Sequence, residues 1–267
     1  MQAAHCRVAN TPDEIYIFGG DDPVTKLCST SAQGFKPKTG QWKKYPDIPD
    51  GGRSLHSLAV GPHHIALVGG FRVNILSALN ILVFSIHENQ WVSEQVALKQ
   101  AWQWCRACFT NEHLYIFSGT VDGPEDIDFN FARTIERVEV NDLLKQKVKE
   151  TEEIKIEMPD LVGDWLGALC GASCHMGNNV ILICGGMRQC PGELFDVDGF
   201  LFDTNHGRFY RVQDPDAHFR MPFPCPAMIH RGHITLATPN SIDAPSFLEG
   251  YLSPNYVLEF KEHTQKA

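Results

Sequence analysis

The sequence contains no apolar run that approaches the ~20 consecutive residues needed to span a bilayer. Its first residues, MQAAHCRVAN, lack the apolar centre of a secretory signal peptide. An excess of basic residues is also absent, since the chain carries 23 Lys and Arg against 32 Asp and Glu, a net charge of -9. Sequence-independent binding to nucleic acid depends on a basic surface. We therefore expect no membrane span and no nucleic-acid partner.

Several motifs of catalysis and metal binding are also absent. There is no GxSxG turn that would hold a nucleophile and no glycine-rich loop before a helix that would bind phosphate. Cys105 and Cys108 form one CxxC pair, whereas a zinc ribbon needs two. The nine cysteines are an odd number, and a chain of 267 residues can bury a core without disulfides. We expect reduced thiols in the cytoplasm or nucleus, no metal or cofactor, and no enzymatic activity.

A repeated pattern is present. Three apolar runs end in two glycines, IYIFGG (15–20), IALVGG (65–70) and ILICGG (181–186). LYIFSG (114–119) is a weaker version, and HITLAT (233–238) is a degenerate one. The repeat length is about 50 residues, the period of one class of propeller.

Every repeat contains the signals of about four short strands. A short apolar segment precedes the run that ends in each glycine pair. After the glycines comes a further strand-like run, then a tight turn and often an aromatic residue. The dipeptides TG, EN and HG mark these turns. In the fifth repeat residues 255–263 occupy the place of the third strand, so we expect its outer strand to be absent or to be supplied by the other terminus. The charged run Val140–Glu153 predicts an exposed helical excursion between outer strands of the third repeat. A four-stranded sheet cannot bury both faces alone, and radial stacking of sheets solves this.

These features resemble the kelch-repeat family, whose signature is a double glycine followed about 21 to 23 residues later by an aromatic residue. The resemblance implies an all-β fold, a single kelch-type β-propeller of four-stranded antiparallel blades over residues 1–267. We expect five blades, at approximately 1–51, 52–103, 104–166, 167–223 and 224–267. The residues that carry the repeat are Gly19, Gly20, Trp42, Gly69, Gly70, Trp91, Gly119, Gly185 and Gly186.

The resemblance also predicts structural roles for the second repeat. Gly69 and Gly70 would let the end of a strand pass close to the neighbouring blade, where a Cβ atom would collide. Trp91 would fill the space between two sheets after the turn His87–Gln90.

The remaining candidate for function is a surface at the mouth of the channel. In successive repeats Arg53 and Arg106 are expected at one equivalent place, and Arg72 and Arg188 at another. Arginine and tryptophan dominate binding hot spots, and arginines of such loops in substrate-recognising kelch domains bind acidic peptide segments. The expected partner-binding residues are Arg53, Phe71, Arg72, Trp104, Arg106, Trp165 and Arg188.

The sequence therefore predicts a protein-interaction module that binds an acidic segment of a partner, as in substrate recognition for a ubiquitin ligase. The isolated domain is expected to be monomeric. Two alternatives stay open: a kelch-fold enzyme or metalloprotein with its site at the same channel mouth, and a cytoskeletal or structural scaffold.

Overall fold

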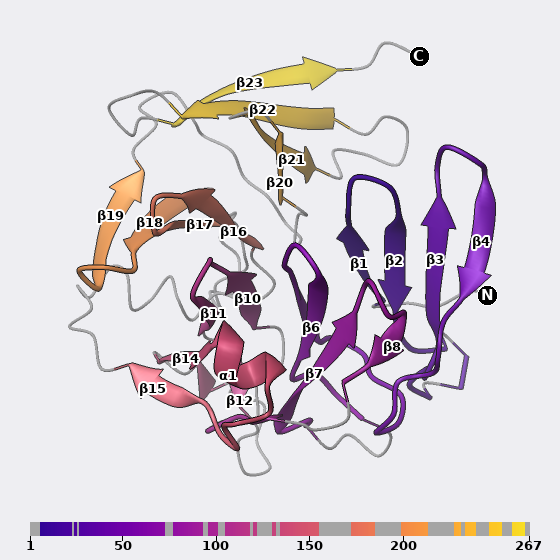
Figure 1. Ribbon diagram of the computed structural model, residues 1–267. Coiled ribbons are helices and arrows are strands. Elements are labelled where there is room, and N and C mark those ends of the chain that lie inside the picture. The colour runs from indigo at the N-terminus through magenta and orange to yellow at the C-terminus, as the bar shows by residue number, and fades with distance from the viewer. Residues whose placement is uncertain are drawn as a thin grey trace. The chain divides into compact units, whose positions relative to one another are not determined.

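The computed structural model describes residues 6–154, apart from 23, 26, 73–76, 93–95, 101–104, 118–119, 122–129 and 132–133, and then 172–184, 199–212, 227–230, 233–238, 246–252 and 258–264 (Figure 1). The chain divides into two compact units, residues 1–155 and 156–267. Each unit is built from antiparallel sheets in which the strand order follows the chain order. This confirms the all-β class.

The first unit contains three sheets, each beginning with the strand that precedes the glycine pair. Sheet 1 consists of β1 (Arg7–Asn10), β2 (Ile15–Phe18), β3 (Ala32–Lys36) and β4 (Gln41–Lys44). Sheet 2 consists of β5 (Ser57–Val60), β6 (His64–Val68), β7 (Asn80–Ser85) and β8 (Gln90–Trp91), with β9 (Val96–Ala97) also paired to β7. Sheet 3 consists of β10 (Arg106–Phe109), β11 (His113–Phe117), β14 (Ile135–Glu139) and β15 (Glu152–Ile154). A separate two-stranded sheet pairs β12 (Thr120–Val121) with β13 (Asn130–Phe131).

The second unit contains two further four-stranded sheets. Sheet 4 consists of β16 (Ala172–Gly177), β17 (Val180–Cys184), β18 (Gly199–Asp203) and β19 (Arg208–Val212). Sheet 5 consists of β20 (Ala227–His230), β21 (His233–Thr238), β22 (Ser246–Leu252) and β23 (Leu258–Thr264). Each of the five predicted repeats thus contains one sheet of at least four strands.

One prediction about an individual repeat was wrong, and another was right only in part. The fifth repeat does not lack its outer strand, because residues 246–252 form the third strand and residues 258–264 form the fourth. The run Val140–Glu153 does contain a helix between the outer strands β14 and β15, as predicted, and most of its residues are exposed or half-buried. The prediction was wrong in extent, because the helix α1 covers only Val140–Leu144 and buries Leu143, and Glu152–Ile154 form β15, the outer strand of sheet 3.

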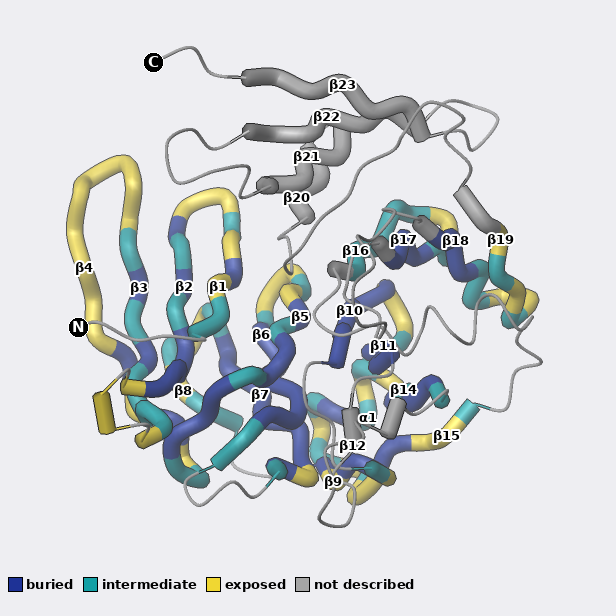
Figure 2. The backbone as a smooth tube through the Cα atoms, turned by 180° about the vertical axis from the view of Figure 1, so that it is seen from behind, coloured by how far each residue is buried: buried dark blue, intermediate teal, exposed yellow. Residues whose placement is uncertain are grey.

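The core of the first unit lies between its sheets, and sheet 2 is covered on both faces (Figure 2). Tyr16 and Phe18 of sheet 1 pack against one face of sheet 2, including Phe84. Ile116 of sheet 3 packs against the other face, including Val83. Successive side chains of a strand point to opposite faces, which explains why all six residues of β7 are buried.

The first strands lie nearest to the neighbouring sheets. In the first unit β5 contacts β1 and also β10, and in the second unit β16 contacts β20. Within each unit, contacts between neighbouring four-stranded sheets are thus found at their first strands.

The glycine pairs satisfy two separate requirements. Gly19 and Gly20 have φ of 61° and 97°, and Gly69 and Gly70 have φ of 60° and 94°, a backbone region that residues with a Cβ atom rarely adopt. At Gly19 a Cβ atom would also collide with the carbonyl oxygen of Arg53, in the loop that leads into the next sheet. At Gly70 the near neighbour belongs to its own repeat, since a Cβ atom there would lie 2.6 Å from the carbonyl oxygen of Ser54. The collision predicted with a neighbouring repeat is thus found at Gly19 but not at Gly70.

The two repeat tryptophans have different surroundings despite equivalent places. Trp91 pairs with Phe84 across the sheet, as Trp42 pairs with Phe35. The ring centroid of Trp91 lies 5.5 Å from that of Phe18 in sheet 1, and its Nε1 donates a hydrogen bond to the carbonyl oxygen of Pro46 at 2.9 Å. This confirms that Trp91 fills the space between two sheets. Trp42 lies on the face of sheet 1 away from sheet 2 and is 61% exposed.

Candidate functional site

The structure describes four of the seven predicted partner-binding residues: Arg53, Phe71, Arg72 and Arg106. Trp104, Trp165 and Arg188 lie outside the described residues, as do the repeat glycines Gly119, Gly185 and Gly186. The described residues bring Arg53, Phe71 and Arg72 together at one end of sheet 2, where the loop before β5 meets the loop after β6.

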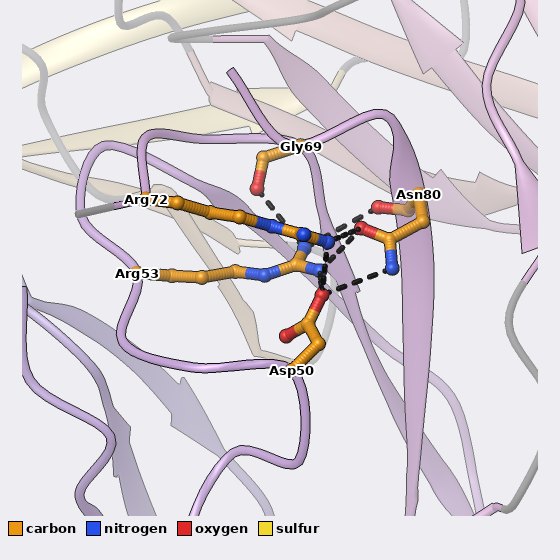
Figure 3. A network of polar contacts seen from close by, with 5 residues as sticks. All are labelled: Asp50, Arg53, Gly69, Arg72 and Asn80. Atoms are coloured by element: carbon orange, nitrogen blue, oxygen red, sulfur yellow. Dashed lines mark hydrogen bonds and ion pairs between the residues drawn. The ribbon is translucent and has the colours of Figure 1, made fainter. Parts of the chain in front are cut away.

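Arg53 lies at the centre of a polar network (Figure 3). Its Nη1 donates to the carbonyl oxygens of Gly69 at 3.1 Å and Asn80 at 3.3 Å. Its Nη2 donates to the carboxylate of Asp50 and to the side-chain oxygen of Asn80. The side chain is 0% exposed, so Arg53 holds the loop against β7 and does not itself present a surface.

Arg72 shares the same two acceptors from the outer side of the network. Its Nη2 donates to the Asp50 carboxylate and, at 3.1 Å, to Oδ1 of Asn80. The Arg72 side chain is 36% exposed, while that of Asp50 is 9% exposed. Two guanidinium groups therefore surround one carboxylate, which leaves one positive charge in excess on the side that faces solvent.

The ionisation of Asp50 reflects these contacts. Burial is the largest influence on its pKa and acts to raise it, because a desolvated carboxylate is disfavoured. Hydrogen bonds from Arg53 and Asn80 and the charges of both arginines together outweigh burial, so the pKa of Asp50 lies below its ordinary value of 3.8. The carboxylate is thus charged at neutral pH.

Phe71 connects the two loops through its backbone. Its N–H donates to the carbonyl oxygen of Ser54 at 2.8 Å, and the N–H of Ser54 donates to the carbonyl oxygen of Phe71 at 3.1 Å. The Phe71 side chain is partly buried beside the half-exposed Arg72. Direct contact of Phe71 with a partner stays a prediction.

Arg106 does not occupy the place of Arg53. Arg106 pairs with Phe117, the last residue of β11. The residues in the same place of the other two sheets are Ser57, which pairs with Val68 at the end of β6, and Arg7, which pairs with Phe18 at the end of β2. Arg53 lies four residues before Ser57, so the predicted equivalence was wrong. Arg106 is 1% exposed and is separate from the Arg53 network.

Sequence reasoning missed Asp50 and Asn80, to which it assigned no role. A buried arginine needs a charged partner, and this rule could have led to Asp50. The burial of Arg53, however, is not visible in the sequence.

The described part of the chain shows no group of three or more His, Cys, Asp or Glu side chains suited to a metal ion. Cys105 and Cys108 are buried and form no disulfide. Among the described helices, none has the length and apolar character to cross a membrane.

No model of a protein family matches the chain, and a search of curated proteins finds no match either.

Proposed function

We propose that this chain is a protein-interaction module that binds an acidic segment of a partner through Arg72 and the adjoining Phe71. The excess positive charge of the Asp50, Arg53 and Arg72 cluster is the observation that carries the proposal. Among the described residues, Nε of Arg72 has no hydrogen-bond partner. That atom is itself buried, so a partner carboxylate would meet the exposed part of the Arg72 side chain, which is 36% exposed.

Rigidity of the site also supports this function. Arg53 is tied to Asp50, Gly69 and Asn80, and the backbone of Phe71 is tied to Ser54. The guanidinium of Arg72 is itself bonded to Asp50 and Asn80. It is thus held before a ligand arrives, which reduces the entropy lost on binding.

The test is selection of short random peptides displayed on phage, using the full chain as bait. Selected peptides should be enriched in Asp and Glu, and their affinity should fall as salt is added. Arg72→Glu should weaken binding at least tenfold, since a hydrogen bond to a charged group contributes about 1.5–3 kcal/mol. The control is Arg208→Glu, the same charge change at an exposed site of sheet 4. Equal binding by both variants would contradict the proposal.

We also propose that the five sheets form a kelch-type β-propeller. The kelch-like repeats and the contacts between first strands support it. In a propeller every sheet has a neighbour on each face, so closure of the ring would cover the face of sheet 1 that carries Trp42.

Trp42 reports on this fold. In a closed ring it should be as shielded as Trp91, whereas on an open face it stays accessible. The measurement is acrylamide quenching of fluorescence, with the contribution of each residue obtained from Trp42→Phe and Trp91→Phe. Much stronger quenching of Trp42 than of Trp91 would argue against closure.

A further inference from the structure

His56 lies in the loop that leads from Arg53 into β5, and it is fully buried. Among the described residues, neither ring nitrogen has a hydrogen-bond partner. Burial is costly for a polar group that makes no hydrogen bond, and far more so for a charged one. The imidazole is therefore stable here only in its neutral form.

His56 lies against Gly19 and Gly70, one glycine from each of two glycine pairs. A Cβ atom on Gly19 would lie 3.1 Å from Cε1 of His56, and one on Gly70 would lie 2.7 Å from Cβ of His56. The absence of side chains at these glycines creates the space that the histidine occupies. His56 thus lies at the junction where sheets 1 and 2 meet.

The charges around His56 are unfavourable for a proton. Arg7 of β1 donates from Nε to the carbonyl oxygen of His56 at 2.9 Å, and Arg53 precedes it on its own loop. Desolvation, then Arg7, then Arg53 lower the pKa of His56 well below 6.5. The Cys105 thiol, which also lies near Arg7, offers no negative charge because burial raises its pKa to about 12.

The same loop holds the candidate site together. The carbonyl oxygen of Arg53 accepts from the N–H of Gly20 at 2.7 Å, and Ser54 exchanges two hydrogen bonds with Phe71. A loop displaced by a charge at His56 would lose both connections. Arg53 and Arg72 would then no longer be fixed around Asp50.

We propose that His56 is a proton-operated switch: its protonation opens the junction between sheets 1 and 2 and releases an acidic partner from Arg72. Only the release step rests on the function proposed above. In the opened state the imidazole regains an ordinary pKa of about 6.5. Opening therefore takes up a proton below that pH, and the folded junction is favoured above it.

Amide hydrogen exchange on the full chain tests the opening without any ligand. After correction for intrinsic exchange rates, the opening constants of Gly20, Ser54 and Phe71 should rise about tenfold between about pH 7.5 and about pH 5.5. His56→Phe keeps a ring of similar shape but cannot be protonated, so the rise should disappear. His63→Phe removes an exposed histidine with the same change in charge and should behave as wild type. The sequence pI is 5.7, so the net charge of the whole chain also changes between about pH 7.5 and about pH 5.5. The His63→Phe control separates this general effect from protonation of His56.

A rise that persists in His56→Phe, or no rise in the wild type, overturns the switch. If His56→Phe does not fold, the ring nitrogens of wild-type His56 can be followed by NMR. A neutral ring in the folded state down to about pH 5.5 supports the proposal, and titration near 6.5 in the folded state overturns it. Peptide affinity at neutral pH tests the binding function separately.

Discussion

Replacing Asp50 with Asn is expected to lower the free energy of unfolding by about 3–5 kcal/mol, the cost of leaving a buried charge without its partner. The Arg53 side chain is 0% exposed, and Asp50 carries the negative charge closest to its guanidinium in this network. Asparagine keeps the shape and one oxygen acceptor, so the loss comes from charge. Urea unfolding of the full chain measures it.

Two further variants separate the buried ion pair from charge in general. Asp13→Asn removes an exposed carboxylate paired with Lys38, and it should change stability little because exposed pairs contribute little. Asp50→Asn combined with Arg53→Met removes both charges and should recover much of the lost stability. A double variant no more stable than Asp50→Asn alone would show that the network acts through shape.

Replacing Gly19 with Ala is also expected to lower the free energy of unfolding strongly. Two causes contribute, and a matched control can separate them. The backbone of Gly19 has φ of 61°, which costs a residue with a Cβ atom about 1–2 kcal/mol. The new methyl group would also meet the backbone carbonyl of Arg53, which cannot move without disturbing the site.

Gly40→Ala is the control, because Gly40 has nearly the same φ, 67°, and no atom within 4 Å of its potential Cβ. Thermal unfolding of both variants isolates the steric cost at the junction. We expect Gly19→Ala to lose clearly more stability than Gly40→Ala. Equal losses would mean that backbone conformation alone explains the glycine pair.

The strands and turns were predictable because their causes are local. The turn dipeptides correspond to residues with positive φ, Gly40, Asn89 and Gly207, and the apolar runs before the glycines form the second strands. The third strand of sheet 5 was missed because Ser246–Leu252 contains Glu249 and Gly250, which weaken a strand pattern judged by composition.

The site was predictable only in part, because burial depends on packing between repeats. Arg72 follows a glycine pair, so its partial exposure agrees with a loop position. Arg53 also follows two glycines, a position typical of an exposed loop residue. The fold of sheet 2 nevertheless buries its side chain. Its partners Asp50 and Asn80 are 3 and 27 residues away, and no local pattern links all three.

The enclosure of β7 on both faces has a consequence for the behaviour of partly unfolded chains. Its sequence, NILVFS, contains no charge and no proline, the composition typical of segments that stack into amyloid-like zippers. While sheets 1 and 3 cover it, this segment is inaccessible. A chain in which sheet 1 has detached would expose it to other molecules, so the packing around His56 also protects the protein from self-association.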